Sequence, residues 1–184
     1  MKRLAALAEA LLLSACQYSQ ARTGAPDQSY VESPTSIRAS SGLLDGTGKA
    51  VGFASFSETR LGVLVDLKVT GLPAGKHGVH IHAVGKCDRP DFMSAGAHFN
   101  PANAQHGLHN AKGPHAGDLP NLDVADDGSG HLSYVDPLIS LQTGASNSVL
   151  GLSLVIHANA DDEQTDPAGN SGARIACGLI AKPT

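Results

Sequence analysis

The feature that most limits the fold of this chain is a repeated alternation of short apolar runs with turn residues, which begins at Ile37. Ala50–Ser57 and Leu61–Thr70 are two such runs, and the residues between them predict a hairpin. Asp126-Asp127-Gly128 is a second hairpin signal. No stretch carries a sustained helical period. The pattern predicts an all-β domain of about eight strands that closes a barrel or a sandwich.

The charge of the chain argues against nucleic acid as a partner. The formal net charge is -4, and no run of Lys and Arg is present. A protein that binds nucleic acid neutralises phosphates with a basic patch or stripe. We therefore expect no nucleic-acid partner.

The first residues have the pattern of an export signal. Lys2 and Arg3 precede a short apolar run, and Leu13 to Ala15 form a small-residue cleavage site in front of Cys16. A cleavage site that ends in cysteine resembles the bacterial lipobox, which implies a lipoprotein-type signal at residues 1–15 and lipidation of Cys16. An ordinary secretory signal is the alternative. Residues 16–36 lack an apolar period and are expected to form a flexible tether.

The domain boundaries follow from this reading, with the folded domain at residues 37–184. We expect an exported protein, periplasmic or in the cell envelope, that contacts the membrane through its N-terminal lipid. Lipidation would leave Cys87 and Cys177 as a pair, and outside the cytosol two cysteines are expected to form a disulfide. Two free thiols or a metal site are the alternatives.

A long polar loop between Asp88 and Pro120 interrupts the strand pattern, and such loops in compact domains are usually functional. Just before it, His80 and His82 stand two apart on a period-two segment, so both imidazoles project from one face of a strand. The pair can clamp a metal, or it can be two surface histidines placed by chance. Within the loop, three imidazoles and one carboxylate form a donor set that zinc accepts: His98, His106, His115 and Asp118.

Five segments, in their order and spacing, resemble the copper/zinc superoxide dismutases. They are Gly75–His82 (GKHGVHIH), Gly96–Pro101 (GAHFNP), His115–Leu122 (HAGDLPNL), the single His157 and Gly169–Gly178 (GNSGARIACG). The similarity covers residues 37–184. It implies an eight-stranded Greek-key β-barrel or sandwich with long metal-binding loops, and an enzyme that converts superoxide to dioxygen and hydrogen peroxide.

The resemblance also implies one copper and one zinc ion per subunit, with His98 shared between them and active in catalysis. The copper ligands would be His80, His82, His98 and His157, and the zinc ligands His98, His106, His115 and Asp118. Asp161 matches a residue that hydrogen-bonds one ligand of each metal, here His80 and His106. It could instead be an exposed loop carboxylate.

Three further histidines lie outside these sets. His109 is three residues from His106 and would be the zinc ligand if the register of the loop differed. The spacing in the family favours His106. We expect His77 to be a packing residue and His131 to be a solvated strand residue.

Arg174 matches an arginine that borders the copper channel and attracts the substrate anion, although it could be an ordinary surface charge. A permanently charged guanidinium suits that role. The segment from Ala158 to Ala173 contains four acidic residues and no Lys or Arg, whereas eukaryotic members carry guiding lysines there. Steering must come from elsewhere, and the candidates besides the metals are Arg174, Lys86, Arg89 and Lys112.

Two other functions compete with this interpretation. A periplasmic copper/zinc-binding lipoprotein would use the same ligands without turnover, and a β-sandwich binding module would carry the histidines by accident. The sequence leaves the choice between monomer and homodimer open.

Overall fold

The computed structural model describes residues 37–183. The predicted signal at 1–15, the lipidation of Cys16 and the tether over 16–36 lie outside the described residues. Within the described range, no helix has the length and apolar content that crossing a membrane requires.

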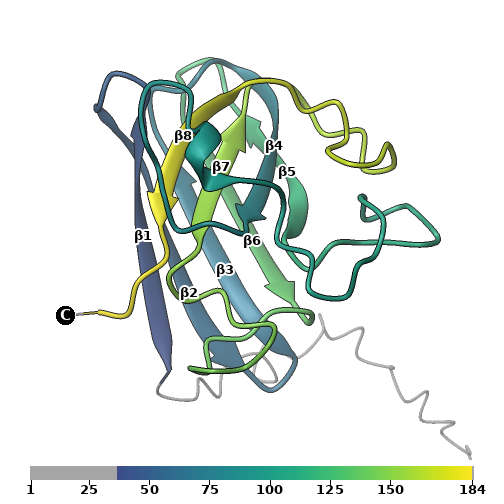
Figure 1. The fold of residues 1–184 in the computed structure, drawn as a ribbon. Coiled ribbons are helices and arrows are strands. Elements are labelled where there is room, and N and C mark those ends of the chain that lie inside the picture. Colours follow the sequence, from purple (N-terminus) through teal and green to yellow (C-terminus); the bar gives the residue numbers. More distant parts are fainter. Residues whose placement is uncertain (1–36, 184) are drawn as a thin grey trace, which may run out of the picture.

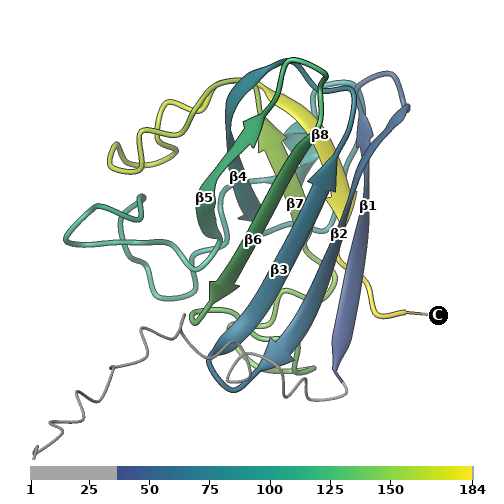
Figure 2. The same cartoon turned by 180° about the vertical axis from the view of Figure 1, so that it is seen from behind.

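Eight antiparallel strands form a closed barrel, which confirms the predicted fold (Figures 1 and 2). Both predicted hairpins are present, because the turn signals fall where the period-two runs end. Around the barrel the order is β1-β2-β3-β6-β5-β4-β7-β8. The strands are β1 Arg38–Asp45, β2 Ala50–Thr59, β3 Gly62–Val69, β4 Gly75–His82, β5 Asp118–Val124, β6 Gly130–Asp136, β7 Ser153–His157 and β8 Arg174–Leu179.

The connections give the barrel a Greek-key topology. Strands β4, β5 and β6 follow one another as neighbours, and the chain then crosses from β6 to place β7 beside β4. The crossing places β7 antiparallel beside β4, with Ser153 opposite His82 and Ile156 opposite Val79, although about seventy residues of sequence separate the two strands. This contact determines which side chains meet at the site described below.

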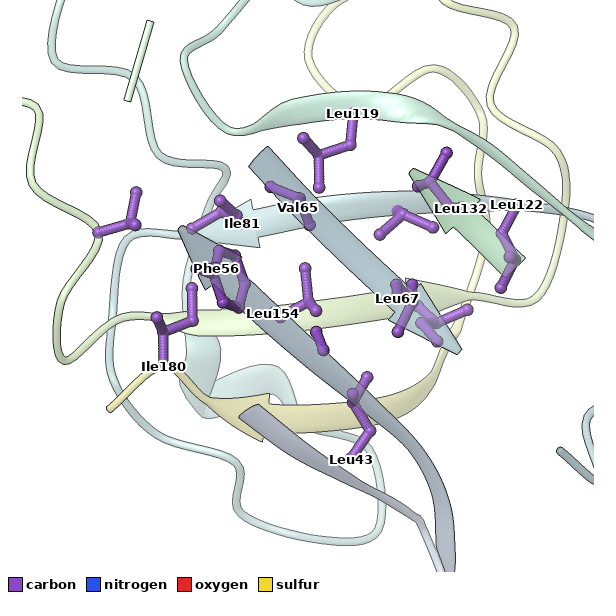
Figure 3. Close-up of a cluster of buried hydrophobic side chains, with 14 of the residues drawn as sticks. Leu43, Phe56, Val65, Leu67, Ile81, Leu119, Leu122, Leu132, Leu154 and Ile180 are labelled. Carbon is purple, nitrogen blue, oxygen red and sulfur yellow. The ribbon is translucent and has the colours of Figure 1, made fainter. Parts of the chain in front are cut away.

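The core of the barrel consists of the apolar side chains that face inward from the strands. Phe56, Val65, Ile81 and Leu154 are fully buried and point into the interior from four different strands (Figure 3). Burying a side chain of this size contributes about 1.5–3 kcal/mol each, so the interior supplies most of the stabilisation. On β4, Val79 and Ile81 belong to this core, which directs His80 and His82 to the outer face of the barrel.

Two long loops cover the outer face of β4 and β7 and project from the same side of the barrel (Figure 1). One runs from residue 83 to 117 and includes a short 3-10 helix, η2 (Met93–Ala95). The other runs from residue 158 to 173. Because the loops lie over the outer face, His80 and His82 are buried although they point away from the core.

Candidate metal centre

Backbone pairing brings together the four histidines of one cluster, which are His80, His82, His98 and His157. In the pairing of β4 with β7, His80 lies opposite Val155 and His82 opposite Ser153, and His157 ends β7 two residues after Val155. The first loop adds His98 through an isolated antiparallel bridge to His82. Regular backbone pairing therefore fixes the positions of these rings.

Four ring nitrogens converge on one point of this cluster. One ligand atom from each of His80, His82, His98 and His157 lies within 4.8 Å of the others. The Nε2 atoms of His82 and His157 are 3.3 Å apart. Nδ1 of His80 and Nε2 of His98 are buried without a hydrogen-bond partner. Unsatisfied buried nitrogens that face one another are costly unless a cation occupies the space between them.

The opposite nitrogens of these rings are held by acceptors. His82 Nδ1 donates to the carbonyl oxygen of Gly96 at 2.9 Å, and His157 Nδ1 donates to that of Gly172 at 3.1 Å. His80 Nε2 donates to Asp161 Oδ2 at 2.6 Å. Metal-ligating histidines are oriented in this way, because the acceptor fixes the tautomer and leaves the other nitrogen free for the ion.

A second cluster surrounds Asp118 at the start of β5. Its Oδ1 atom lies 3.1 Å from His98 Nδ1, 3.0 Å from His106 Nδ1 and 3.4 Å from His115 Nδ1. Two donors of a tetrahedral zinc ion with bonds of about 2.0–2.1 Å lie roughly 3.3 Å apart. The three separations are those of such a donor set. Asp118 Oδ2 accepts the backbone N–H groups of Gly107 and His115.

His98 belongs to both clusters and presents a different nitrogen to each. Its Nδ1 faces Asp118, and its Nε2 faces the first cluster. His80 also lies within 4.8 Å of the donors around Asp118. Its Nε2, however, is occupied by Asp161, so His115 is the better fourth donor of that set.

Asp161 connects the two clusters from the second loop. Its Oδ2 accepts from His80 and its Oδ1 accepts from His106 Nε2 at 3.0 Å. Asn121 of β5 holds the backbone of Asp161 through two hydrogen bonds of 2.8 Å, one to the N–H and one to the carbonyl. This carboxylate is buried, and it is not an exposed loop residue.

Burial and charge separate the pKa values of the two clusters. Burial lowers the pKa of His80 to about 3, of His82 to about 2 and of His157 to about 4, so all three are neutral near pH 7. Burial also acts to lower the pKa of His106, but hydrogen bonds to Asp118 and Asp161 outweigh it and raise this pKa to about 9. Although burial opposes it, hydrogen bonds from His106, His115 and His98 lower the pKa of Asp118.

The three remaining histidines lie apart from the clusters. His109 is 69 % exposed, and its Nδ1 pairs with Glu163 at 2.8 Å, whereas His106 is fully buried. His77 is buried with ring nitrogens on the carbonyls of His157 and Pro73. His131 is exposed and pairs with Asp66.

Sequence reasoning missed the role of Asn121 and of Gly169. Gly169 has φ 59, and a Cβ there would collide with the Asp161 carboxylate and lie 2.6 Å from His106 Nε2. Only glycine allows this approach. The positions of both residues in the quoted segments HAGDLPNL and GNSGARIACG were the only available signal.

A cavity of about 430 Å³ opens over the first cluster and is lined by His82, His98 and His157. Arg174 is the only Lys or Arg among its lining residues in the described chain. The guanidinium donates to the carbonyl oxygens of Phe92 at 2.7 Å and Gly96 at 2.6 Å. The Cys87–Cys177 disulfide ties β8 to the same loop, as expected from the sequence. Arg174 is thus held at the cavity wall.

Comparison with known proteins identifies the family. The family model described as copper/zinc superoxide dismutase matches residues 50–180. The chain belongs to this family. The family model spans both clusters of candidate metal ligands.

Named relatives extend over most or all of the chain. Superoxide dismutase [Cu-Zn] 2 of Aquifex aeolicus is 40% identical over 185 residues, which cover 98% of this chain and 99% of that protein. Superoxide dismutase [Cu-Zn] 1 of the same organism is 44% identical over 142 residues, 75% of this chain and 84% of that protein.

Solved structures of the same family have a similar fold. A double mutant of a superoxide dismutase-like protein from Bacillus subtilis, in which a tyrosine and a proline are replaced by histidine, aligns with a TM-score of 0.74. It is 45% identical and covers 77% of this chain and 96% of that one. The clock protein EA4 aligns with a TM-score of 0.69 at 33% identity and covers 80% and 94%.

Proposed function

We propose that this protein catalyses the dismutation of superoxide at a copper ion that shares an imidazole with a zinc ion. The observation that carries the proposal is the placement of His98, whose two ring nitrogens face two different donor sets. Copper would be held by His80, His82, His98 and His157, and zinc by His98, His106, His115 and Asp118.

The donors fit these two ions. The first set consists of imidazoles alone, which suits copper(II), and it contains buried nitrogens with no other partner. The second set includes a carboxylate and has tetrahedral spacings, which suits zinc. Asp161 receives a hydrogen bond from one ligand of each set, so it orients both.

When bound, copper supplies one-electron chemistry, by which one superoxide is oxidised to dioxygen and a second, with two protons, is reduced to hydrogen peroxide. The residues supply the geometry. His98 can hold a proton at Nε2 and release it while its Nδ1 stays fixed on the zinc side. The neutral His80, His82 and His157 keep their donor nitrogens unprotonated near pH 7.

Arg174 would attract the substrate and orient it in the cavity. Its two hydrogen bonds to carbonyl oxygens hold the guanidinium in place without neutralising its charge. Asp166 is the only carboxylate among the lining residues of the described chain, so the field at the wall depends strongly on Arg174.

The proposal extends to the place of action. A disulfide persists in oxidising compartments, and Cys87–Cys177 therefore supports export to the periplasm or cell envelope. Residues 1–15 would act as a lipoprotein signal and Cys16 as the lipid-bearing residue. Membrane fractionation of a Cys16→Ser variant, which should be released in soluble form, tests the anchor.

The test of the activity is a superoxide assay on protein reconstituted with copper and zinc, beside His157→Ala and His131→Ala. We expect activity in the wild type and in His131→Ala, which changes an exposed histidine, and loss in His157→Ala. Metal content is measured on the same samples. Stoichiometric uptake of both ions without turnover would instead support the copper/zinc-binding alternative.

A further inference from the structure

Met93 begins the short helix η2, on the loop of residues 83–117, which contributes several lining residues of the metal cavity. Its side chain is 64% exposed, and the residue lines the same cavity as His82, His98 and His157. It is the single methionine of the described part of the chain. The proposed dismutation does not require this thioether.

The backbone at Met93 is held firmly, so the position of the side chain at the cavity is a property of the fold. The carbonyls of Phe92 and Gly96, on either side of η2, both accept from Arg174. The N–H of Met93 donates to Asp91 Oδ1 at 3.0 Å. Phe92 is fully buried and packs with the Cys87–Cys177 disulfide. The thioether therefore emerges from an anchored segment.

A thioether is a soft, uncharged ligand that favours copper(I) over copper(II) and zinc. A second observation points to a metal at the same wall. His98 is 8% exposed, and its Nε2 is buried without a hydrogen-bond partner while the residue lines this cavity. The carboxylate of Asp166 lines this cavity and favours the approach of a cation.

We propose that Met93 is an entry ligand for copper(I), which it binds together with imidazoles of the cavity before the ion reaches its final nitrogen ligands. The inference rests on the proposed copper site. No electron is transferred in this step: bonds from copper(I) to the external donor are exchanged for bonds to the thioether and then to imidazole. The site selects copper(I) kinetically, and it contributes no ligand to the final set.

The experiment follows the uptake of copper by zinc-loaded protein. Copper(I) is supplied as an acetonitrile complex under anaerobic conditions, and copper(II) is supplied as its glycine complex in parallel. Three proteins are compared: the wild type, Met93→Leu and the double variant Met93→Leu/Leu61→Met. Leu61 is 55% exposed at the turn between β2 and β3 and is absent from the cavity lining, so the double variant moves the thioether away from the site.

We expect Met93→Leu to slow copper(I) uptake by about tenfold, which corresponds to about 1.4 kcal/mol of activation free energy. The double variant should be equally slow, and copper(II) uptake should be the same in all three proteins. Final copper content should not change. X-ray absorption of a His157→Ala protein loaded with copper(I) should show a sulfur neighbour that disappears in Met93→Leu/His157→Ala.

Wild-type copper(I) uptake rates in Met93→Leu would overturn the inference, as would an equal slowing for both oxidation states or the absence of sulfur scattering. These results leave the proposed function intact, provided that the loaded proteins dismutate superoxide. A wild type that binds no copper, or binds it without turnover, would instead refute the proposed function.

Discussion

Arg174 and His82 share one acceptor, the carbonyl oxygen of Gly96. Arg174 Nη2 donates to it at 2.6 Å, and His82 Nδ1 donates at 2.9 Å. The residue expected to attract substrate and a residue expected to hold copper are thus positioned by the same backbone atom. Gly96 has φ 76, a conformation that favours glycine, so this carbonyl is aimed by a backbone that few other residues would adopt.

Replacing Arg174 with alanine should lower kcat/KM for superoxide by roughly tenfold at low ionic strength and weaken its salt dependence. The reason is the loss of electrostatic steering, of which superoxide dismutase is itself the standard example. Arg174→Lys keeps the charge but cannot donate to two carbonyls in the planar arrangement, so we expect an intermediate rate.

Lys112→Ala is the matched control, because it removes one positive charge from the neighbouring loop without touching the cavity lining. Pulse radiolysis at two ionic strengths measures all four proteins. Equal rates for Arg174→Ala and the wild type at low salt would contradict the steering role.

Replacing Asp161 with asparagine should weaken the affinity for both metals by about 10–100-fold. An amide has only one acceptor oxygen, whereas the carboxylate accepts from both His80 and His106. One of the two imidazoles then faces the side-chain N–H of the amide instead of an acceptor, so this ring has to adopt the other tautomer. Competition with a chelator measures the affinities, and Asp123→Asn, at an exposed carboxylate, is the control. Unchanged affinity for both ions would exclude the bridging role of Asp161.

Zinc and copper binding should differ in the number of protons released near pH 7. His106, with a pKa raised to about 9, is protonated in the metal-free protein and must lose its proton to bind zinc. His80, His82 and His157 have lowered pKa values and are already neutral. We expect about one proton from His106 on zinc binding and almost none from these three on copper binding.

Calorimetric titration in buffers with different ionisation enthalpies counts these protons. The release on zinc binding should disappear in His106→Ala and should fall in the wild type as the pH rises through 9. Equal proton release for the two metals would contradict the assignment.

The strands could be predicted from the sequence because alternation is a local property. The alternation over residues 79–82 already indicates that Val79 and Ile81 face the core and that the two histidines face the other side. The structure confirms the core positions of the two apolar residues. The loop ligands are different. The spacing in the family favoured His106 over His109, but the residues of the loop did not decide between them, because both lie in an irregular segment whose register depends on the second loop.

Other features of the structure could not be predicted from side-chain identity. The carbonyl oxygens of Phe92 and Gly96 are backbone atoms, and only the folded loop shows that they accept from Arg174. Asp136 lies at the end of a strand with no unusual sequence context, yet it is buried. Both depend on contacts between segments distant in sequence.

The disulfide should stabilise the domain and hold Arg174 in place. Cys87 and Cys177 are 90 residues apart, so removal of the cross-link should lower the free energy of unfolding by about 4.6 kcal/mol on the chain-entropy model. Urea unfolding of Cys87→Ala/Cys177→Ala measures this change. The same variant should retain zinc but lose part of the salt dependence of the rate, because the loop that carries the Phe92 and Gly96 carbonyls is released. A rate with unaltered salt dependence would show that the loop does not need the cross-link.

Asp136 should make the protein less stable as the pH rises from about 4 to 7. It is 2% exposed at the end of β6, its Oδ1 accepts the N–H of Leu138 at 2.8 Å, and its Oδ2 has no partner. Burial raises its pKa from 3.8 to about 7, although the Leu138 hydrogen bond opposes this shift. The folded state therefore binds the proton more tightly than the unfolded state, and its stability falls where the unfolded carboxyl ionises first.

The side chain at position 136 does not ionise in Asp136→Asn, so comparison of this variant with the wild type isolates the contribution of Asp136 ionisation to stability. The unfolding free energy of the wild type, minus that of Asp136→Asn, should decrease by roughly 2–3 kcal/mol between pH 5 and pH 8. Urea titrations of both proteins with the same metal content measure this difference, and Asp123→Asn is the exposed control. The unpartnered amide of the variant shifts its stability by a constant amount, so it does not affect the slope. Parallel curves for the wild type and Asp136→Asn would show that Asp136 is ionised across this range and that burial does not hold its proton.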